Sequence, residues 1–242
     1  MAETRPPAAP AHPELGSNTI AIISRKWHIN VVRLEELLTA VGPQPVFETG
    51  LLLAGDVDPS DVRRQLSRWV RAGVLVQLRR GLYSLAPPYQ KTRPHPFDLA
   101  NRLVPGSYVS LQSALAHHGH IPEDVPMVTS VTLGRPGRRD TPLGSHQYHH
   151  LARDVFGGYE LVALGAGHSA FVAVPEKALL DLVHLVPRGD DPDFLEGLRL
   201  QRLHALDLDS LAKSGIVARR PRLRRALRRL GDLAAREEAL AG

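Results

Sequence analysis

Residues 58–85 read DPSDVRRQLSRWVRAGVLVQLRRGLYSL, and this stretch decides which fold we expect. Its apolar residues recur at the spacing of one face of an α-helix: Val62, Leu66, Trp69 and Val70. Gly73 follows the last of them, where a left-handed C-cap is expected. The β-prone runs 74–78 and 82–85 surround Gly81, which can adopt the positive φ of a tight turn. The stretch therefore predicts one long helix followed by a two-stranded hairpin.

The opposite face of this helix is basic, and so is the turn of the hairpin. Between residues 59 and 84 there are six arginines and one acid, a net charge of +5. The whole chain also carries +5, so the remainder sums to zero. A helix with one apolar and one arginine face, followed by a basic hairpin, is typical of a winged helix-turn-helix, whose helix enters a major groove. The alternative is a solvated amphipathic helix followed by an ordinary hairpin.

We expect the DNA contacts of such a domain to divide by position. Arg64, Ser67 and Arg68 face away from the apolar side of the helix, so they are the candidates for reading base edges. Arg79 and Arg80 at the hairpin turn are candidates for holding phosphates or the minor groove. The complete set of predicted DNA-binding residues is Ser60, Arg63, Arg64, Ser67, Arg68, Arg71, Arg79 and Arg80.

Composition sets the broad class of protein. The 242 residues are 43% hydrophobic and 23% charged, which are ordinary values for a globular protein of one large or two modest domains. The absence of cysteine excludes disulfides and thiolate metal sites. No apolar run approaches the roughly 18–20 residues of a membrane span, and the N-terminus lacks the apolar core of a signal peptide. We therefore expect a cytoplasmic protein without a membrane partner, and the pI near 9.9 favours nucleic acid.

Proline-rich segments divide the chain. Two helices expected at 31–41 and 49–54 complete the three that a winged helix-turn-helix requires. The four prolines between 86 and 96 predict a stiff extended linker. The expected organisation is α+β, with a disordered tail at 1–18, a winged helix-turn-helix DNA-binding domain at 19–86, a linker at 87–96 and a C-terminal α/β domain at 97–242.

The second domain mixes helical and strand patterns. Strands are expected at about 127–133, 145–151, 159–164 and 170–174. Helices are expected at about 97–104, 110–118, 175–183 and 221–238, with Ser110 capping the second of them. Residues 134–144 are expected to form a basic loop that either contacts phosphates or RNA or is simply solvated.

Several local signatures occur in an order that resembles the AbiEi-type antitoxins of abortive-infection, or type IV, toxin–antitoxin systems. The resemblance covers about residues 30–215, and the ordered set is more specific than any one motif. The signatures are RRGLY at 79–83, YVSLQSAL at 108–115 with His118-Gly119, a histidine-rich strand ending near Leu151, FGGY at 156–159 and VPEKALLDL at 174–182.

The resemblance implies an N-terminal winged-helix DNA-binding domain and a C-terminal antitoxin domain of mixed α/β structure. It also implies repression of the protein's own operon and neutralisation of a nucleotidyltransferase-like toxin, without a necessary stable complex with that toxin. The family's DNA-contacting arginines correspond to Arg79, Arg80 and the 63–71 face. The proline-rich tail and the arginine-dense C-terminus depart from the family and inherit nothing from it.

The remaining polar clusters favour structural roles. Asp190–Asp193 is typical of a loop and helix N-cap, and Glu176 and Asp181 do not share a helix face. Two histidine clusters lack a carboxylate at useful spacing: His117, His118 and His120, and His146, His149 and His150. We therefore expect no catalytic residue, no metal and no cofactor. A secondary basic surface is expected from Arg135, Arg138, Arg139, Arg222, Arg225 and Arg229.

Three classes of function remain. The first is a transcriptional repressor and antitoxin, whose partners are double-stranded operator DNA with inverted repeats and a nucleotidyltransferase-like toxin. The second is a one-component winged-helix transcription factor with a ligand-sensing C-terminal domain. The third is an enzyme with a DNA-targeting module, against which the lack of a nucleophile elbow or phosphate-binding glycine loop argues. A nucleotidyltransferase-like reading frame directly downstream would favour the first class over the second.

Overall fold

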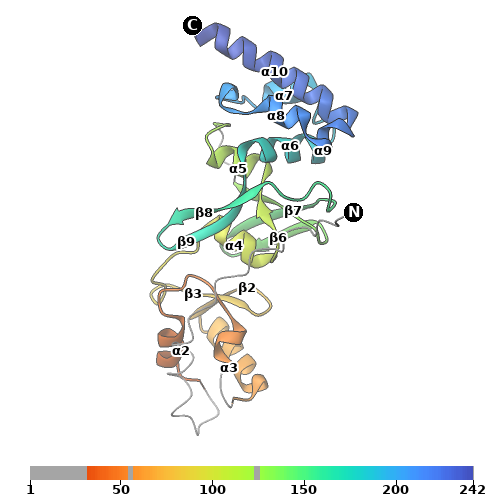
Figure 1. The fold of residues 1–242 in the computed structure, drawn as a ribbon. Helices are drawn as coiled ribbons and strands as arrows, with labels where there is room; N and C mark the ends of the chain where they lie inside the picture. Colours follow the sequence, from red (N-terminus) through yellow and green to blue (C-terminus); the bar gives the residue numbers. More distant parts are fainter. Residues whose placement is uncertain (1–31, 54–56, 123–125, 242) are drawn as a thin grey trace, which may run out of the picture.

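Three layers are stacked along the long axis of the molecule in the computed structural model (Figure 1). The structure describes residues 32–53, 57–122 and 126–241. Among these residues, a small sheet with two helices lies at one end, a larger sheet lies in the middle, and a group of helices lies at the other end. The tail expected at 1–18 lies outside the described residues, as do the beginning of the domain expected at 19–86 and part of the turn before the arginine-faced helix.

The described part of the N-terminal layer contains three helical segments and then the hairpin, as expected, but the second segment is a short 3₁₀ helix and an unpredicted strand precedes it. The elements are α2 (Leu34–Val41), β1 (Phe47–Glu48), the 3₁₀ helix η1 (Thr49–Leu52), α3 (Pro59–Arg71), β2 (Leu75–Arg79) and β3 (Leu82–Leu85). The strands pair antiparallel in the order β1-β3-β2. α3 begins where the Asp58 side chain accepts a hydrogen bond from the Ser60 amide. Gly73 and Gly81 have φ of +71° and +82°, which confirms the predicted helix end and hairpin turn.

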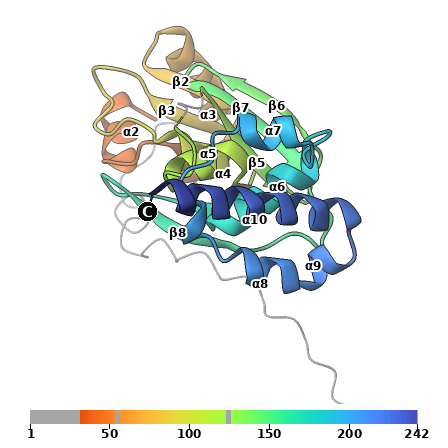
Figure 2. The same ribbon diagram turned by 90° about the horizontal axis from the view of Figure 1, so that it is seen from above.

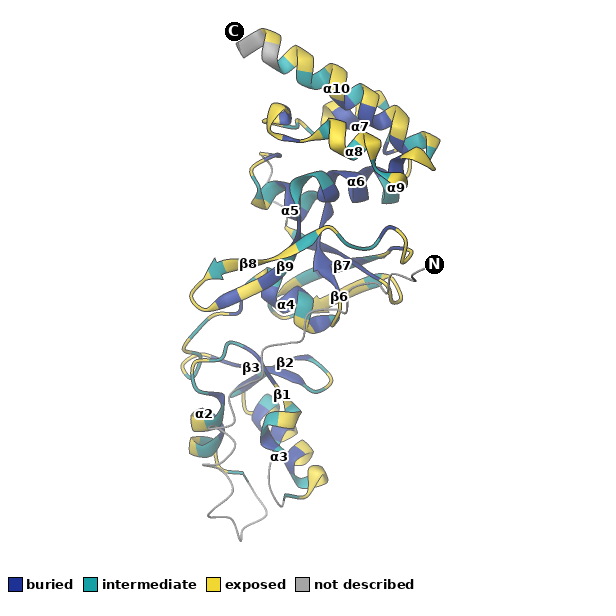
Figure 3. Ribbon diagram, viewed as in Figure 1, coloured by how far each residue is buried: buried dark blue, intermediate teal, exposed yellow. Residues whose placement is uncertain are grey.

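The apolar face predicted for α3 is confirmed. Val62, Leu66 and Trp69 are buried and pack with residues of α2 and the hairpin in one hydrophobic cluster. Burying each such side chain contributes about 1.5–3 kcal/mol, which fixes α3 against the small sheet. The opposite face of the helix remains exposed (Figure 3).

The segment that follows the hairpin folds back onto it. The amides of Tyr89 and Gln90 both donate to the Ala86 carbonyl, at 2.9 and 3.1 Å, so the segment begins with a turn. The Gln90 side chain donates to Ser84 Oγ at 3.1 Å and to the Leu85 carbonyl at 3.0 Å. The expectation of a stiff extended linker is therefore wrong at its start, because proline fixes its own φ but does not prevent a turn.

The larger sheet is mixed. Its strands are β4 (Tyr108–Val109), β5 (Met127–Thr132), β6 (Gly137–Thr141), β7 (Gly144–His150), β8 (Tyr159–Gly165) and β9 (His168–Ala173), in the order β6-β7-β5-β4-β9-β8. The pairs β4–β9 and β5–β7 are parallel, and the others are antiparallel. All four strands predicted for the second half are confirmed, and the fold class is α+β as expected.

An edge strand occupies much of the loop expected at 134–144. β6 pairs antiparallel with β7, with Arg138 opposite Gln147 and Arg139 opposite His146. Successive charged residues conceal this strand from pattern-based prediction, although charges on an edge strand also discourage pairing with other chains. The prediction of a basic loop is therefore wrong for residues 137–141.

Helices cover both faces of the larger sheet. α4 (Pro96–Leu103) lies on the side of the small sheet, whereas α5 (Leu111–His117) and α6 (Pro175–Leu185) lie on the other side (Figure 1). Beyond them follow α7 (Pro192–Gly197), η2 (Leu203–Ala205), α8 (Leu208–Lys213), α9 (Gly215–Ala218) and α10 (Pro221–Ala241). α10 crosses over this layer when the molecule is viewed from above (Figure 2). Among the described residues, no helix has both the length and the apolar character that crossing a membrane requires.

A third apolar cluster joins the two sheets. It consists of Val46, Leu78, Leu82, Leu99, Leu103 and Tyr148. Val46 and Leu82 are fully buried, and the Tyr148 hydroxyl donates to the Ala100 carbonyl at 2.7 Å. We call this cluster the joint between the N-terminal layer and the larger sheet. Sequence periodicity does not predict it, because its members come from five separate segments.

Candidate nucleic-acid interface

The exposed face of α3 carries most of the predicted DNA-binding residues. Arg63, Arg64, Ser67, Arg68 and Arg71 are all exposed on the side opposite the buried apolar face. This helix lies at the end of the molecule farthest from α10 (Figure 3). An α-helix with its side chains is about 10–12 Å across, which matches the roughly 12 Å width of a major groove.

Two of the predicted DNA-contact residues, Ser60 and Arg64, bind acidic residues at the start of α3. Ser60 Oγ donates to Asp58 Oδ1 at 2.6 Å, and the hydrogen bonds from Ser60 lower the pKa of Asp58. Arg64 forms an ion pair with Asp61 in the same helix. The three other arginines of this face have no acidic partner in the part of the chain that the structure describes: Arg63, Arg68 and Arg71.

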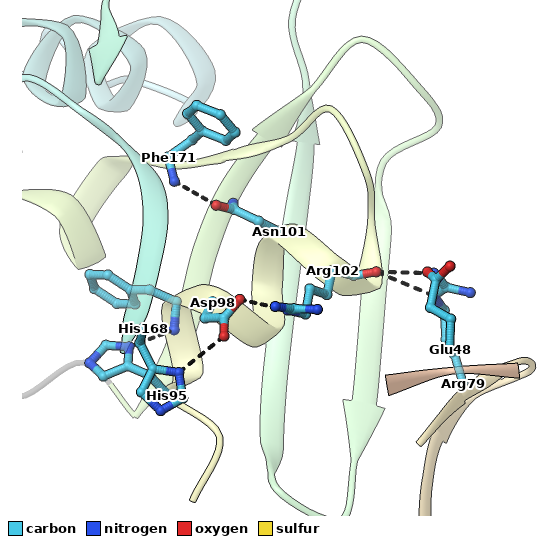
Figure 4. Close-up of polar contacts among 9 residues, drawn as sticks. Glu48, Arg79, His95, Asp98, Asn101, Arg102, His168 and Phe171 are labelled. Carbon is cyan, nitrogen blue, oxygen red and sulfur yellow. Dashed lines mark hydrogen bonds and ion pairs between the residues drawn. The ribbon is translucent and has the colours of Figure 1, made fainter. Parts of the chain in front are cut away.

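Arg79 lies against α4 and not at an open wing tip (Figure 4). Its Nη2 donates to Glu48 Oε1 at 3.2 Å and to the Arg102 carbonyl at 3.1 Å. Its side chain is 33% exposed, whereas the neighbouring Arg80 is exposed. These contacts engage the guanidinium that is expected from the sequence to bind phosphate, so Arg79 differs in this respect from Arg80.

The expected secondary basic surface is divided between two distant places. On β6, Arg138 pairs with Asp140 at 2.7 Å and also donates to Ser145 Oγ at 3.0 Å. Arg135 and Arg139 are exposed nearby. β6 contacts β2, so Arg138 and Arg139 lie on a strand beside the hairpin and not beside α10.

The predicted arginines of α10 bind the protein itself. Both Nε and Nη2 of Arg225 donate to Asp190 Oδ2, at 3.0 and 2.8 Å. Arg222 Nε lies 3.2 Å from Asp190 Oδ1, and Arg229 donates to the Asp190 carbonyl. These arginines connect α10 to the segment between α6 and α7, so their side chains already have acceptors within the protein.

Two other arginines of α10 point into solvent. Arg224 and Arg228 are exposed and, together with Arg225, line a groove of about 680 Å³ between α8, α9 and α10. The helical period separates the two sets, because 222, 225 and 229 share one side of the helix while 224 and 228 share another. Applied to the arginine run, that period would have distinguished them from sequence alone.

Three of the antitoxin-like signatures meet at a buried ion pair. Lys177 pairs with Asp181 one turn further along α6. Tyr108 OH and Ser110 Oγ donate to the other carboxylate oxygen at 3.1 and 2.8 Å. Gly158 packs on the Lys177 stem, where an added Cβ would lie 3.0 Å from Lys177 Cγ. Burial raises the pKa of Asp181 and lowers that of Lys177, and their mutual attraction opposes both shifts.

We assign this buried network a structural role, because both oxygens of the Asp181 carboxylate accept hydrogen bonds within it. Ser110 occupies the N-cap position of α5 as expected, but its hydroxyl donates to Asp181 and makes no capping hydrogen bond. The prediction that this side chain caps α5 is therefore wrong. The i,i+4 spacing of Lys177 and Asp181 is the sequence signal that indicates their pairing.

Two histidines of the first predicted cluster contact different parts of the chain. His118 Nε2 lies 2.9 Å from the Ala173 carbonyl, and His120 Nδ1 lies 3.0 Å from the Gln201 carbonyl. Within 32–53, 57–122 and 126–241, no group of three or more histidine, aspartate or glutamate residues could hold a metal ion. Asp191 caps α7 by accepting from the Asp193 amide at 3.1 Å, which confirms the interpretation of the acidic run as a loop and N-cap.

Comparisons with known proteins define the fold alone. No family model matches this chain, and no curated protein matches it. One solved structure with a similar fold is that of the RV2827C protein from Mycobacterium tuberculosis, with a TM-score of 0.50 and 17% sequence identity. The match covers 81% of this chain and 76% of that one. The likeness supports an α+β arrangement over most of the chain and does not bear on the antitoxin resemblance.

Proposed function

We propose that this protein is a DNA-binding transcriptional regulator that enters the major groove through the exposed face of α3. The observation that carries the proposal is the placement of Arg63, Arg64, Arg68 and Arg71 on one exposed face at the end of the molecule. Three of them lack an acidic partner among the described residues. Clustered cationic side chains of this kind supply the affinity of proteins for the phosphate backbone.

The order of elements supports a winged helix-turn-helix as the DNA-binding unit. In that motif two helices cross at a turn, the second enters the groove, and a hairpin follows as the wing. η1 and α3 would be the helix pair, and β2 and β3 would be the wing. Strand β1 pairs with β3, which extends the wing into a three-stranded sheet.

The proposal is tested with the full-length protein and an operator selected from a random pool of duplex DNA. Wild-type affinity should fall with salt at a log–log slope of about −3 to −4 if the four arginines of α3 contact phosphates. The triple variant R63A/R68A/R71A should lose most of this slope and most of the affinity.

A matched control removes three exposed arginines at the other end of the molecule. R219A/R224A/R228A changes the net charge by the same amount but leaves α3 intact. It should retain the affinity and the slope of the wild type. If both triple variants lose binding equally, net charge alone explains the interaction and the assignment of α3 is wrong.

We further propose that the protein counteracts a nucleotidyltransferase-like toxin, and the sequence resemblance supports this second role. The test begins with a search for a nucleotidyltransferase-like reading frame directly downstream, whose product is then co-expressed with the full-length protein or with R63A/R68A/R71A. Rescue by the variant that cannot bind DNA would assign neutralisation to the second half of the chain. Loss of rescue would make the effect transcriptional, and the second domain would then be a dimerisation or ligand-sensing domain.

A further inference from the structure

A chain of polar contacts connects the hairpin to the larger sheet through α4 (Figure 4). It begins at Arg79, which donates to Glu48 Oε1 and, through Nε and Nη2, to the Arg102 carbonyl at 3.4 and 3.1 Å. The Arg102 side chain continues the chain, because its Nε donates to Asp98 Oδ1 at 2.8 Å. Asp98 Oδ2 lies 3.0 Å from His168 Nδ1 at the start of β9.

The two ends of this chain differ in burial. Asp98 and His168 are both 6% exposed, so the end at the larger sheet is shielded from solvent. A second anchor lies nearby, where the Phe171 amide donates to Asn101 Oδ1 at 2.6 Å. α4 is therefore fixed to β9 at two points, and Arg79 is the polar group that attaches the hairpin to this fixed helix.

The same region contains the apolar joint. Leu78 directly precedes Arg79, Leu82 begins the next strand, and both lie in one apolar cluster with Leu99 and Leu103 of α4. Apolar contacts are non-directional, so they hold the two halves together without specifying their mutual rotation. Hydrogen bonds are directional, and a guanidinium that binds Glu48 and the Arg102 carbonyl at once defines one orientation.

We infer that Arg79 is a positioning residue for DNA recognition, which orients α3 through the hairpin and does not itself bind DNA. The inference rests on the proposed function, and it assigns to Arg79 a role opposite to the phosphate contact that its position in the sequence suggests. α3 packs on β2, so the orientation of the hairpin on α4 also sets the direction of the arginine face relative to the second half of the molecule.

Loss of the Arg79 contacts would change the fraction of molecules in which the hairpin has this orientation on α4. We call the molecule docked when Arg79 binds Glu48 and the Arg102 carbonyl and so holds the hairpin on α4. If only docked molecules bind DNA, the apparent dissociation constant rises as their fraction falls. A docked fraction of one tenth weakens binding about tenfold. No phosphate contact is lost in this process, so the salt slope remains that of the wild type. Loss of a true phosphate contact would instead reduce the slope by about 0.9.

The experiment compares Arg79→Ala with Arg80→Ala, which removes the same charge from the adjacent exposed residue. Arg79→Ala should weaken operator binding about tenfold at an unchanged salt slope. Arg80→Ala should reduce the slope by about 0.9 if Arg80 contacts a phosphate. An equal reduction of the slope by Arg79→Ala would show that Arg79 binds DNA directly, and the inference would be overturned.

Glu48→Ala distinguishes the two roles of Arg79, because they predict opposite changes in operator affinity. The Glu48 side chain is 63% exposed, so its removal leaves the core intact. If Arg79 positions the hairpin, the loss of its carboxylate partner lowers operator affinity. If Arg79 binds phosphate, the same variant releases the guanidinium, removes a negative charge and raises affinity.

A readout without DNA separates this inference from the proposed function. The chain contains no cysteine, so the pair Ala72→Cys and Ala212→Cys accepts two spin labels at exposed positions in the two halves. The distance distribution between the labels should be narrow in the wild type and Arg80→Ala and broad in Arg79→Ala. A narrow distribution in Arg79→Ala would refute the positioning role. Failure of the wild type to bind any DNA would refute the proposed function, while the distances would still report whether Arg79 docks the hairpin.

Discussion

Arg64 and Arg71 lie on the same exposed face of α3, Arg64 in its N-terminal half and Arg71 in its last turn. In the proposed function α3 is the recognition helix, whose N-terminal part contacts base edges while its last turn lies nearer the backbone. We expect Arg64→Ala to relax sequence preference by about 1–3 kcal/mol, whereas Arg71→Ala weakens all sequences alike. Competition between the selected operator and a scrambled duplex measures the difference. The two variants should change the specificity ratio differently, and identical changes would contradict this division.

His146 is buried in β7, and neither ring nitrogen has a hydrogen-bond partner among the described residues. Burial lowers the pKa of His146 to about 4. The unfolded chain, with a pKa near 6.5, therefore binds more protons than the folded protein between about pH 4 and 6.5, and stability falls as the pH falls through this window.

We expect His146→Leu to remove part of this pH dependence. Between pH 7 and pH 5 the free energy of unfolding of the wild type should fall by about 2 kcal/mol more than that of the variant. Urea unfolding at the two pH values measures the difference. His204→Gln, which alters an exposed histidine, should retain the full dependence of the wild type.

Single residues were predictable where the local pattern decides their exposure. The outward direction of Arg63 and Arg68 follows from the helical period of their own element. The contacts of Arg79 and Arg222 do not follow from any local pattern, because their partners Arg102 and Asp190 are 23 and 32 positions away in the chain and are brought near by tertiary packing. The sequence therefore identifies a basic helix face more reliably than it identifies which arginines are available to a ligand.

At the scale of elements, Asp190 gathers three arginines of α10, in addition to the buried apolar face of that helix. Asp190 accepts from Arg225, pairs with Arg222, and its carbonyl accepts from Arg229. We expect Asp190→Ala to destabilise the packing of α10 by about 1–2 kcal/mol, because these arginines are partly solvated and their pairs are weaker than buried ones. Hydrogen exchange of the α10 amides should accelerate in this variant. Asp193→Ala, at an exposed residue of the following helix, is the control and should leave the exchange unchanged.

Elements with strong local signals were predictable, and those that depend on partners were not. α3 has an apolar period, an aspartate cap and a glycine after its last turn, so its bounds agree closely with expectation. β4 has only two residues and exists because β5 and β9 pair with it on either side. β6 carries charges in place of alternation and is defined by its register with β7. Strand pairing of this kind is non-local and leaves no mark in a short window of sequence.

For the whole molecule, the joint predicts how the N-terminal half behaves alone. A fragment ending at residue 90 would expose Val46, Leu78 and Leu82, which are at most 6% exposed in the intact chain. We expect this fragment to be less stable than the same region of the full protein by several kcal/mol, since each side chain loses roughly 1.5–3 kcal/mol of burial. Trp27 and Trp69 both precede residue 90, so tryptophan fluorescence during urea unfolding compares the two directly.

A longer fragment provides the control for this comparison. Extending the chain to residue 104 adds α4 and restores Leu99 and Leu103 to the joint. The longer fragment should recover part of the lost stability. Equal stability of the fragment ending at residue 90 and the intact protein would mean that the joint contributes nothing to the N-terminal layer.

The joint also determines where the gene can be cut and recombined. α4 follows the proline-rich segment, yet its side chains complete the core of the layer that precedes that segment. A chimera that exchanges N-terminal layers between related proteins at residue 90 would place a foreign hairpin against the host's α4. Exchanging residues up to 104 would keep the hairpin with its own helix but would separate Asp98 from His168. Neither crossover point is neutral, so the two halves are expected to be inherited together and to diverge as one unit.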